Sequence, residues 1–402
     1  MTATALPANG KEAALSAPVI LLLAATCGLL IANLYFVQPI ADLVARDFTL
    51  DRAGVGFLTT LPLAGYGAGL LFVVPLGDLI ENRRLILAMI ALETVSLFVL
   101  SVVDNVWPFL ATSFLAGLSA TAIQVILPYT SRFLQGPAQG KAVAQLVSGM
   151  MLGIMLARPA SGFNAEILPW HAIYLIAAML IAAMLAGLAW LLPPRRPASG
   201  GAYGELLLSM AAIFRDTELL RRRAAYHAAM FGTFISFWTA APLWLAGAPI
   251  HLSQGGIAWV ALAGVAGAIA PPFATRLFDA GYARGGTMSA MLIVIFAMLL
   301  TLAARQGSVL LVVVAAILLD GAVSANLVFG QRTIYALAAD LRGRMNALYI
   351  ATFFIGGAIA SAAAAWCFVR FGWPGAVILC IAMPAASLAY SLTERRTQPE
   401  GT

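Results

Sequence analysis

Charged residues are scarce in this chain. Asp, Glu, Lys and Arg together make up 10% of the 402 residues, whereas apolar residues make up 62%. A water-soluble globule of this size exposes a large share of its residues and could not keep so much apolar surface from water. The composition therefore excludes an ordinary soluble protein and predicts a protein embedded in a membrane.

Cysteines, histidines and catalytic motifs are also few. The three cysteines, Cys27, Cys367 and Cys380, lie within apolar stretches, which indicates small core residues rather than a disulfide or metal set. No HExxH, GxSxG or GxxxxGK[ST] motif occurs, and the three histidines are far apart. No basic stripe interleaved with aromatic residues is present. We therefore expect no enzyme, no catalytic residue, metal or cofactor, no ATP drive and no binding of nucleic acid.

Twelve long apolar stretches account for most of the chain. The hydrocarbon core of a bilayer needs about 20 apolar residues per helical span. The stretches are continuous and lack the alternation of barrel strands, which predicts helices. The predicted spans are residues 17–43, 53–76, 85–103, 106–129, 142–163, 170–192, 224–247, 255–275, 286–304, 308–330, 345–369 and 374–392.

Basic residues are unevenly distributed between the two sides that these spans define. Of the 23 lysines and arginines, 18 fall on the side of both termini, four fall on the other side, and Arg158 lies within a span. Because cytoplasmic loops carry an excess of Lys and Arg, this bias predicts a multi-pass protein of the inner (cytoplasmic) membrane with both termini in the cytoplasm. The net charge of +6 is therefore explained by the excess of Lys and Arg in the cytoplasmic loops.

A polar, basic segment divides the spans into two sets of six. Residues 193–201 read PPRRPASGG, which is typical of a linker, and residues 206–214 form either a short interfacial helix or an ordered piece of that linker. The predicted organisation is a cytoplasmic tail at 1–16, an N-terminal six-helix bundle at 17–192, a cytoplasmic linker at 193–223, a C-terminal six-helix bundle at 224–392 and a cytoplasmic tail at 393–402.

The two sets of spans match in register. Gly153 precedes Trp170 by 17 residues, and Gly356 precedes Trp373 by the same 17. With six spans per copy, both copies start on the same side, so the repeats are parallel. Paired halves of this kind indicate a secondary transporter with its site at their interface near mid-membrane. A purely structural duplication is the alternative.

The loop after the second span carries a distinctive motif. It reads PLGDLIENRR over residues 75–84, and a degraded counterpart, RLFD at residues 276–279 followed by Arg284, comes after the eighth span. Together with twelve spans and a basic central loop, this motif resembles the hallmark loop of the major facilitator superfamily. The resemblance implies an all-α membrane protein of two parallel six-helix repeats, in which spans one, four, seven and ten line a central cavity.

Two further stretches resemble a bacterial branch of that superfamily, the sugar or drug efflux permeases. They are NLYFVQP at residues 33–39 and the segment from Leu319 to Gln331. The chain departs from the family pattern at Glu81, where the usual loop has glycine, and the loop arginines come one residue late. Proton-coupled exporters also carry an arginine four residues before a glycine in span four, a position that Ser113 occupies here. The resemblance therefore implies efflux but supplies no coupling arginine in span four.

The two loop aspartates are candidates for a gate. Asp78 could accept bonds from the start of span eleven near Asn346, or pair with an arginine just before it, and close the cytoplasmic side. Asp279 could do the same towards span five near Lys141. The alternative is a topology signal with solvated aspartates. The predicted gate comprises Asp78, Arg83, Arg84, Asp279, Arg342 and Arg344.

Three ionisable residues, Glu93, Arg158 and Asp320, lie deep within spans and are the candidates for proton coupling, with a structural role as the alternative for Glu93 and Arg158. A charge in hydrocarbon costs roughly 2.5–3.5 kcal/mol on insertion scales, so each needs a partner, a cavity or a proton. Asp320, close to mid-membrane in span ten, is the first candidate for a proton carrier or ligand contact; a neutral, hydrogen-bonded acid is the alternative. Arg158 could pair with an acid across the interface, hold an anionic ligand, or extend outward. Glu93 lies on an outer supporting helix, and a direct pair with Arg158 is not expected.

Polar and aromatic residues on the four lining spans are candidates for the substrate cavity. For any one of them, an interhelical hydrogen bond or a lipid anchor is the alternative. His227 is expected near the cytoplasmic mouth, at the surface. The cavity candidates are Asn33, Tyr35, Gln38, Thr121, Gln124, Phe231, Thr233, Ser236, Phe237, Trp238, Asn326 and Gln331.

The sequence therefore predicts a secondary active transporter that alternates access between two six-helix halves. Proton-coupled efflux of a small organic solute, neutral or amphipathic, is the leading hypothesis. Proton-coupled uptake by symport would look much the same in the sequence, and a non-transporting membrane receptor or scaffold is a remote alternative. The expected partners are a small-molecule substrate, protons and the lipid bilayer, with the chain working as a monomer.

Overall fold

The computed structural model describes residues 15–50, 54–197, 202–247, 250–304, 307–337 and 341–394. Most of the two predicted tails, at 1–16 and 393–402, and part of the predicted linker lie outside these residues. So do five bases that entered the count for orientation, namely Lys11, Arg52, Arg305, Arg395 and Arg396.

The described residues are helical apart from the segments that connect the helices. The helices are α1 (Ala17–Asp47), α2 (Val55–Phe72), η1 (Val74–Asp78), α3 (Asn82–Leu100), α4 (Val106–Ala120), α5 (Ala122–Arg132), α6 (Pro137–Ile167), α7 (His171–Leu191), α8 (Tyr203–Asp216), α9 (Glu218–Ala246), α10 (Gln254–Gly264), η2 (Val265–Ile269), α11 (Ala270–Asp279), α12 (Ala283–Ala303), α13 (Val309–Tyr335) and α14 (Arg342–Leu392).

Ten continuous segments of the described chain are long and apolar enough to cross a membrane. One of them, α14, consists of two passes, because Gly372 breaks the helix with a φ of +65° just before Pro374. α3 is the remaining pass; Arg83, Arg84 and Glu93 make it less apolar. The predicted fold class, twelve helices in two six-helix repeats, is therefore confirmed.

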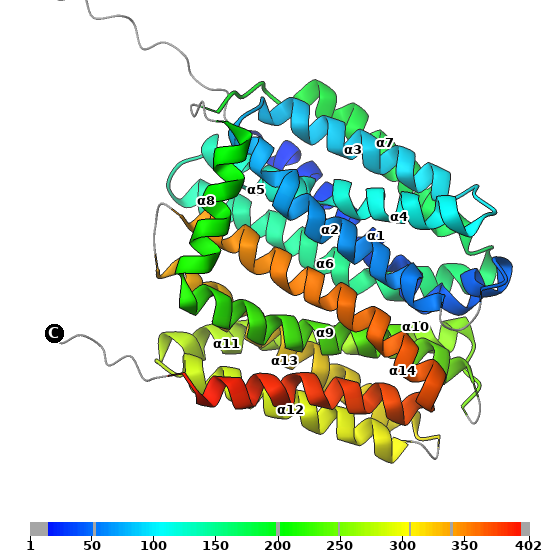
Figure 1. Cartoon of the computed structure of the whole chain (residues 1–402). Helices are drawn as coiled ribbons and strands as arrows, with labels where there is room; N and C mark the ends of the chain where they lie inside the picture. The colour runs from blue at the N-terminus through cyan, green and yellow to red at the C-terminus, as the bar shows by residue number, and fades with distance from the viewer. Residues whose placement is uncertain are drawn as a thin grey trace, which may run out of the picture.

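The spanning helices lie roughly side by side, with α1–α7 forming one half and α9–α14 the other (Figure 1). Helix α8 lies between the halves in sequence and runs across the ends of the spanning helices, so the segment at residues 206–214 is a helix rather than irregular linker. We call the α8 end of the molecule the linker side and the opposite end the far side.

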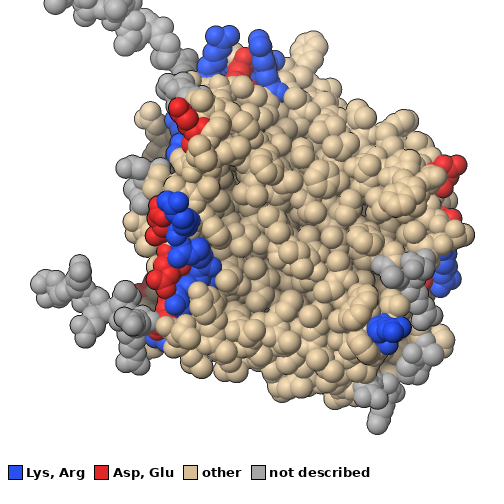
Figure 2. Space-filling model, in the orientation of Figure 1, with Lys and Arg blue, Asp and Glu red and all other residues tan. Residues whose placement is uncertain are grey.

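Charged side chains gather at these two ends. On the face shown in Figure 2, acidic and basic groups lie along the linker side and in smaller number at the far side, and an uncharged belt lies between them. Large apolar side chains such as Val95, Leu292 and Phe296 are exposed on their helices. Such a belt suits contact with lipid tails, so the chain is a multi-pass membrane protein.

Glycines let the helices of each half cross closely at equivalent places. A Cβ on Gly153 of α6 would overlap the carbonyl oxygen of Gly28 in α1. In the second half, Gly356 of α14 packs in the same manner against Ala228 of α9, where a Cβ would lie 2.9 Å from the Ala228 Cβ. Small residues at such crossings let backbones approach and bring van der Waals contacts into range. The repeat noticed in the sequence therefore corresponds to a repeated helix contact.

The α1–α6 crossing can be tested with two alanine substitutions on one helix. Gly153→Ala is expected to destabilise the protein by about 1–3 kcal/mol, because the new methyl group meets backbone that cannot move aside. Gly140→Ala is the matched control, since nothing lies within 4 Å of its Cβ position and alanine favours the helix. Thermal unfolding in detergent measures both. Equal midpoints for the two variants would contradict the close crossing.

Candidate functional site

A cavity of about 150 Å³ lies between the two halves. Helices α1, α2, α5 and α6 line it from the first half, and α9, α10, η2, α13 and α14 line it from the second. Most of its wall is apolar, with methionines of α6 facing phenylalanines of α9 and α14. Its polar lining consists of Tyr35, Tyr66, Gln124, Arg158, His227, Asp320, Ser324 and Gln331.

Arg158 is buried in this wall and does not extend to the surface, since only 4% of the residue is exposed. Its Nε donates a hydrogen bond of 2.6 Å to Oε1 of Gln38. Its guanidinium carbon lies 4.8 Å, 4.7 Å and 5.0 Å from the ring centres of Tyr35, Phe234 and Trp238. Ring faces attract a cation, and this attraction is stronger where water is excluded. The arginine is thus held in a cage of rings from both halves.

Asp320 lies in the same cavity, on α13. Its Oδ1 accepts a hydrogen bond of 3.1 Å from Nε1 of Trp238. The backbone of α10 and η2 passes close by, so a Cβ on Gly264 would lie 2.8 Å from Asp320 Oδ2 and one on Gly267 would lie 2.9 Å from the Asp320 Cβ. Glycine at these two positions therefore leaves room for the carboxylate.

Trp238 connects the two charged residues. Its indole N–H binds Asp320 while its ring lies against the Arg158 guanidinium. The ion pairs within 4.0 Å in the described part of the chain do not include Arg158 with Asp320. The site therefore holds opposite charges that face one cavity without a direct ion pair.

His227 is not at the surface, as the sequence suggested, but buried and part of the cavity wall. Its Nδ1 lies 3.0 Å from Nδ2 of Asn326, and its ring stacks near Tyr349 and meets Phe353 edge-on. The correction arises because α9 begins at Glu218, so His227 lies more than two turns inside the helix.

Glu93 lies apart from the cavity, within the first half. It is fully buried on α3 and accepts hydrogen bonds from Asn33 Nδ2 of α1 and Ser119 Oγ of α4. Asn33, a cavity candidate in the sequence, therefore faces Glu93 and is not among the residues that line the cavity. This cluster ties three helices of one half together.

The other cavity candidates divide into two groups. Tyr35, Gln124, Phe231 and Gln331 line the cavity. The rest pack beside it or bond neighbouring backbone: Gln38 holds Arg158, Trp238 holds Asp320, Asn326 contacts His227, Thr121 bonds its own helix, Thr233 and Ser236 bond α14 carbonyls, and Phe237 packs on Trp238 and Trp373.

Apart from Phe231, sequence reasoning missed the apolar lining of the cavity. Met150, Met151 and Met155 of α6 face it, together with Phe353 and Phe354 of α14. Three methionines within six residues were a usable signal, because flexible thioether side chains suit adaptable binding surfaces. The phenylalanines gave no signal, since aromatic residues are common in every span.

Contacts on the far side of the cavity join the two halves. Gly255 N–H of α10 donates a bond of 2.6 Å to Oε2 of Glu166 in α6, and Phe163 meets Trp259 edge-on. Nearer the cavity, Thr59 of α2 and Ser361 of α14 lie 2.7 Å apart through their hydroxyl oxygens. These contacts join the halves on two sides of the cavity.

The linker side holds a cleft of about 550 Å³ between the halves. Asp78, Arg132 and Arg195 line it from the first half, and Arg344 lines it from α14. The far side also holds a cleft between the halves, of about 610 Å³, lined by Arg46 and Val55 of the first half and Trp244 of the second. The linker-side cleft shares the lining residue Gln124 with the cavity, whereas the far-side cleft shares none of the cavity's lining residues.

Of the predicted gate residues, Asp78 and Arg344 are among those that line this cleft. Asp279 is paired with Arg332 rather than with Lys141, because its helix α11 packs against α13 of the same half, which carries Arg332. The predicted gate arginines bond to nearby groups: Arg83 to the Ala189 carbonyl, Arg84 to Glu81, Arg342 to the Tyr335 carbonyl and Arg344 to Ser209.

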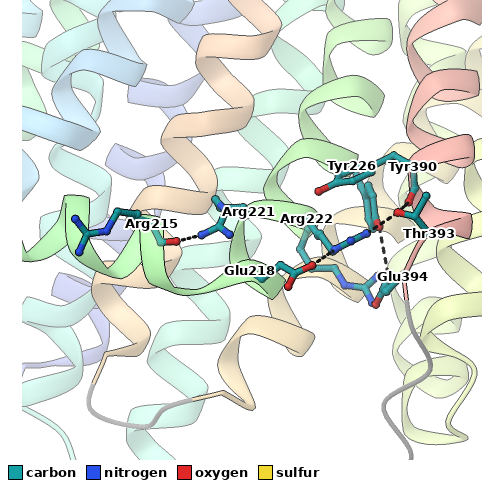
Figure 3. A network of polar contacts seen from close by, with 9 residues as sticks. Arg215, Glu218, Arg221, Arg222, Tyr226, Tyr390, Thr393 and Glu394 are labelled. Atoms are coloured by element: carbon teal, nitrogen blue, oxygen red, sulfur yellow. Dashed lines mark hydrogen bonds and ion pairs between the residues drawn. The ribbon is translucent and has the colours of Figure 1, made fainter.

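A second network on the linker side, which sequence reasoning did not identify, fixes the start of α9 to the end of α14 (Figure 3). Arg223 forms an ion pair of 2.8 Å with Glu394, and both side chains are largely buried, at 7% and 16% exposed. Tyr226 donates a bond to the same carboxylate, and Arg222 bonds Thr393. The linker is thereby anchored to the last helix.

Removing the Glu394 carboxylate is expected to destabilise the protein by about 3–5 kcal/mol, because it leaves the buried Arg223 cation without a counter-charge. The matched control is Asp216→Ala, which removes a pair with Arg215 in which both side chains are mostly exposed and should change stability little. The thermal midpoint of Glu394→Ala in detergent is the measurement. A midpoint no lower than that of the Asp216 variant would show that the network does not hold the linker.

Comparisons with known proteins agree with this architecture. Residues 20–248 match the family model of the Major Facilitator Superfamily. The chain is 33% identical over 92% of its length to the uncharacterized transporter YgaY of Escherichia coli O157:H7, 92% of which is covered. In fold it resembles the nucleoside transporter NupG, with a TM-score of 0.72 at 12% identity over 93% of this chain and 99% of that one. It also resembles the inward-facing, unoccupied crystal structure of a bacterial homologue of the human lysosomal transporter Spinster, with a TM-score of 0.69 at 13% identity over 96% and 95%. The chain belongs to the major facilitator superfamily of membrane transporters.

Proposed function

We propose that the protein is a proton-coupled secondary active transporter that moves a small organic solute across the cytoplasmic membrane by alternating access. The observation that carries the proposal is the presence of Asp320 and Arg158 in one cavity between the two halves. A site at the junction of two repeats is where a rocking motion would change its exposure from one side to the other. The predicted bundles, 17–192 and 224–392, are the proposed moving bodies.

The side on which the cavity opens follows from the proposed orientation. With most bases on the linker side, that side is cytoplasmic by the positive-inside rule. The cleft at Asp78 and Arg344, which shares Gln124 with the cavity, then opens towards the cytoplasm. On the outside, the Glu166–Gly255 contact joins the halves, and the far-side cleft shares no lining residue with the cavity. The conformation is therefore inward-facing. Asp78 and the arginines around it are the groups proposed to close the cytoplasmic side in the opposite state.

A proton is the coupling ion that the site favours. Asp320 is the carboxylate among the described residues that line the cavity, and it has a hydrogen-bond donor in Trp238 but no basic group in ion-pair contact. Carrying a bare charge through an apolar interface is costly, and binding a proton removes that cost. Protonation from one side and release on the other would connect solute movement to the proton gradient.

The direction of transport has two candidates. The resemblance to efflux permeases supports efflux by proton antiport. Uptake by symport is supported by the Arg158 cation, because a proton on Asp320 leaves the cavity positively charged and ready for an anion. Both candidates use the same cavity and the same carboxylate.

Asp320→Asn is expected to abolish proton-driven solute flux while solute exchange without a gradient persists, because the amide fills the same space but cannot carry a proton. A solute screen in cells expressing or lacking the protein, with and without a proton uncoupler, identifies the flux to be measured in proteoliposomes. Glu93→Gln is the matched control: it alters a buried carboxyl outside the cavity and should keep the coupling. Unchanged gradient-driven flux in Asp320→Asn would rule out the proposed role.

A further inference from the structure

We infer that the transported solute is a small organic monoanion, whose carboxylate binds Arg158 and whose apolar body lies against the rings and methionines of the cavity. The inference rests on the proposed function and deepens it by naming the substrate class of the same cavity. It also selects symport among the two directions, because the anion and the proton then bind together.

Arg158 has bonding capacity that the protein leaves unused. Its Nε is bonded to Gln38, but its Nη2 is buried and without a hydrogen-bond partner in the described structure. The Nε2 of Gln38, beside it, is likewise buried and without a partner. Buried donors are nearly always bonded, and an unmade bond at a charged group is costly. Of the two residues, Arg158 lines the cavity and Gln38 lies behind it, so the guanidinium is the group that a ligand in the cavity would reach.

The chemistry of these donors selects a carboxylate. A guanidinium presents its N–H groups in a planar fork that fits two carboxylate oxygens, with shorter and stronger bonds than neutral partners make. Arg158 is compensated by a neutral amide and three rings, and among the described residues it makes no ion pair. A buried cation that lacks a counter-charge is stabilised most by an incoming anion.

The remaining walls limit the body of the ligand. The cavity measures about 150 Å³, a size that holds a benzene-like molecule in an apolar interior. Phe231, Phe353, Phe354 and Met150 surround it. Among the described lining residues, Arg158 and His227 are the basic side chains and Asp320 is the acidic one. Once Arg158 is engaged, a second negative charge on the ligand would meet no further arginine or lysine among these lining residues, so a monoanion fits best.

The cleft on the linker side also favours an anionic ligand. The linker-side cleft is lined by three arginines, Arg132, Arg195 and Arg344, against the single carboxylate of Asp78. Clefts lined mainly by one sign of charge raise the local concentration of the opposite ion. An anion is therefore attracted to the side on which the cavity opens.

Proton and anion binding are coupled by simple charge counting. With Asp320 ionised, the Arg158–Asp320 site is neutral and a bound anion makes it negative; with Asp320 protonated, the bound anion makes it neutral. Each partner therefore increases affinity for the other by the same factor, typically about 5–150-fold for coupled sites. The titratable and charged groups that face this site from the packed helices are Arg158 of α6, His227 of α9, Tyr35 of α1 and Tyr66 of α2.

The first experiment measures binding of benzoate, benzamide and benzylamine to the purified full-length protein by calorimetry. These probes share a ring and differ in charge. Benzoate is expected to bind at least about tenfold more tightly than the other two, because only an ionised carboxylate makes two charge-assisted bonds to the fork. Equal affinity for benzoate and benzamide would overturn the proposal.

Variants locate the site. Arg158→Gln is expected to lose the preference for benzoate, and Arg158→Lys, which keeps the charge but not the fork, to bind at least about tenfold more weakly than the unmodified protein. Size-exclusion profiles show that each variant is folded. Arg46→Gln, which removes an exposed arginine paired with Asp42 outside the cavity, is the matched control and should bind normally. Benzoate binding that survives in both Arg158 variants would overturn the assignment.

Asp320→Asn tests the coupling and separates the two proposals. Benzoate affinity of the unmodified protein should fall from mildly acidic to mildly alkaline buffer as Asp320 ionises; the probe itself stays charged, since carboxylic acids titrate near about pH 4. The variant should bind tightly in both buffers. If the pH dependence of benzoate affinity persists in Asp320→Asn, it comes from another group such as His227, and the proposed coupling is wrong.

Two outcomes distinguish the substrate class from the proposed function. If neutral solutes show Asp320-dependent, proton-driven flux but no carboxylate binds, the substrate class is wrong and the proposed function stands. If benzoate binds through Arg158 but flux does not respond to the proton gradient, the substrate class stands and the proposed proton coupling is wrong.

Discussion

A buried charge must be compensated, and the centre of this transporter depends on how the charges of Arg158 and Asp320 are compensated. Arg158 and Asp320 lie on opposite halves and face one cavity, yet neither neutralises the other directly. The arginine is stabilised by an amide and three rings, and the carboxylate by one indole N–H. This partial compensation leaves a site whose charge changes with one proton, which a fully formed ion pair would suppress.

Trp238 has a particular place in this arrangement. It belongs to α9, contacts the arginine of the first half and bonds the aspartate of the second. Any relative movement of the halves that changes the cavity must change at least one of these contacts. The glycines of α10 and η2 beside Asp320 and those of the α1–α6 crossing allow the surrounding helices to pack without side chains between them. Close packing around a small polar centre is how the fold isolates the site from lipid.

Much of the architecture could be predicted from the sequence because its signals are local. Twelve spans and the duplication follow from apolar runs and repeated glycines, whereas the helix in the linker was one of two alternatives that the sequence left open. Arg158 and Asp320 were also conspicuous, since a charge within an apolar span stands out. The pairing of Asp279 with Arg332, the burial of His227 and the placement of Asn33 beside Glu93 were not predictable in this way. They depend on which faces of distant helices meet, and a single sequence with mostly apolar helices leaves those rotations undetermined.

The repeat and the site also differ in symmetry. Helix contacts recur in the two halves, whereas the arginine occurs on one half and the aspartate on the other.

The measurement that tests the central claim most directly is proton exchange on binding, followed with a pH indicator when benzoate is added to the purified protein in weakly buffered, neutral solution. The account predicts that the unmodified protein takes up protons on binding and that Asp320→Asn binds without proton uptake. Benzoate binding by the unmodified protein with no change in bound protons would contradict it.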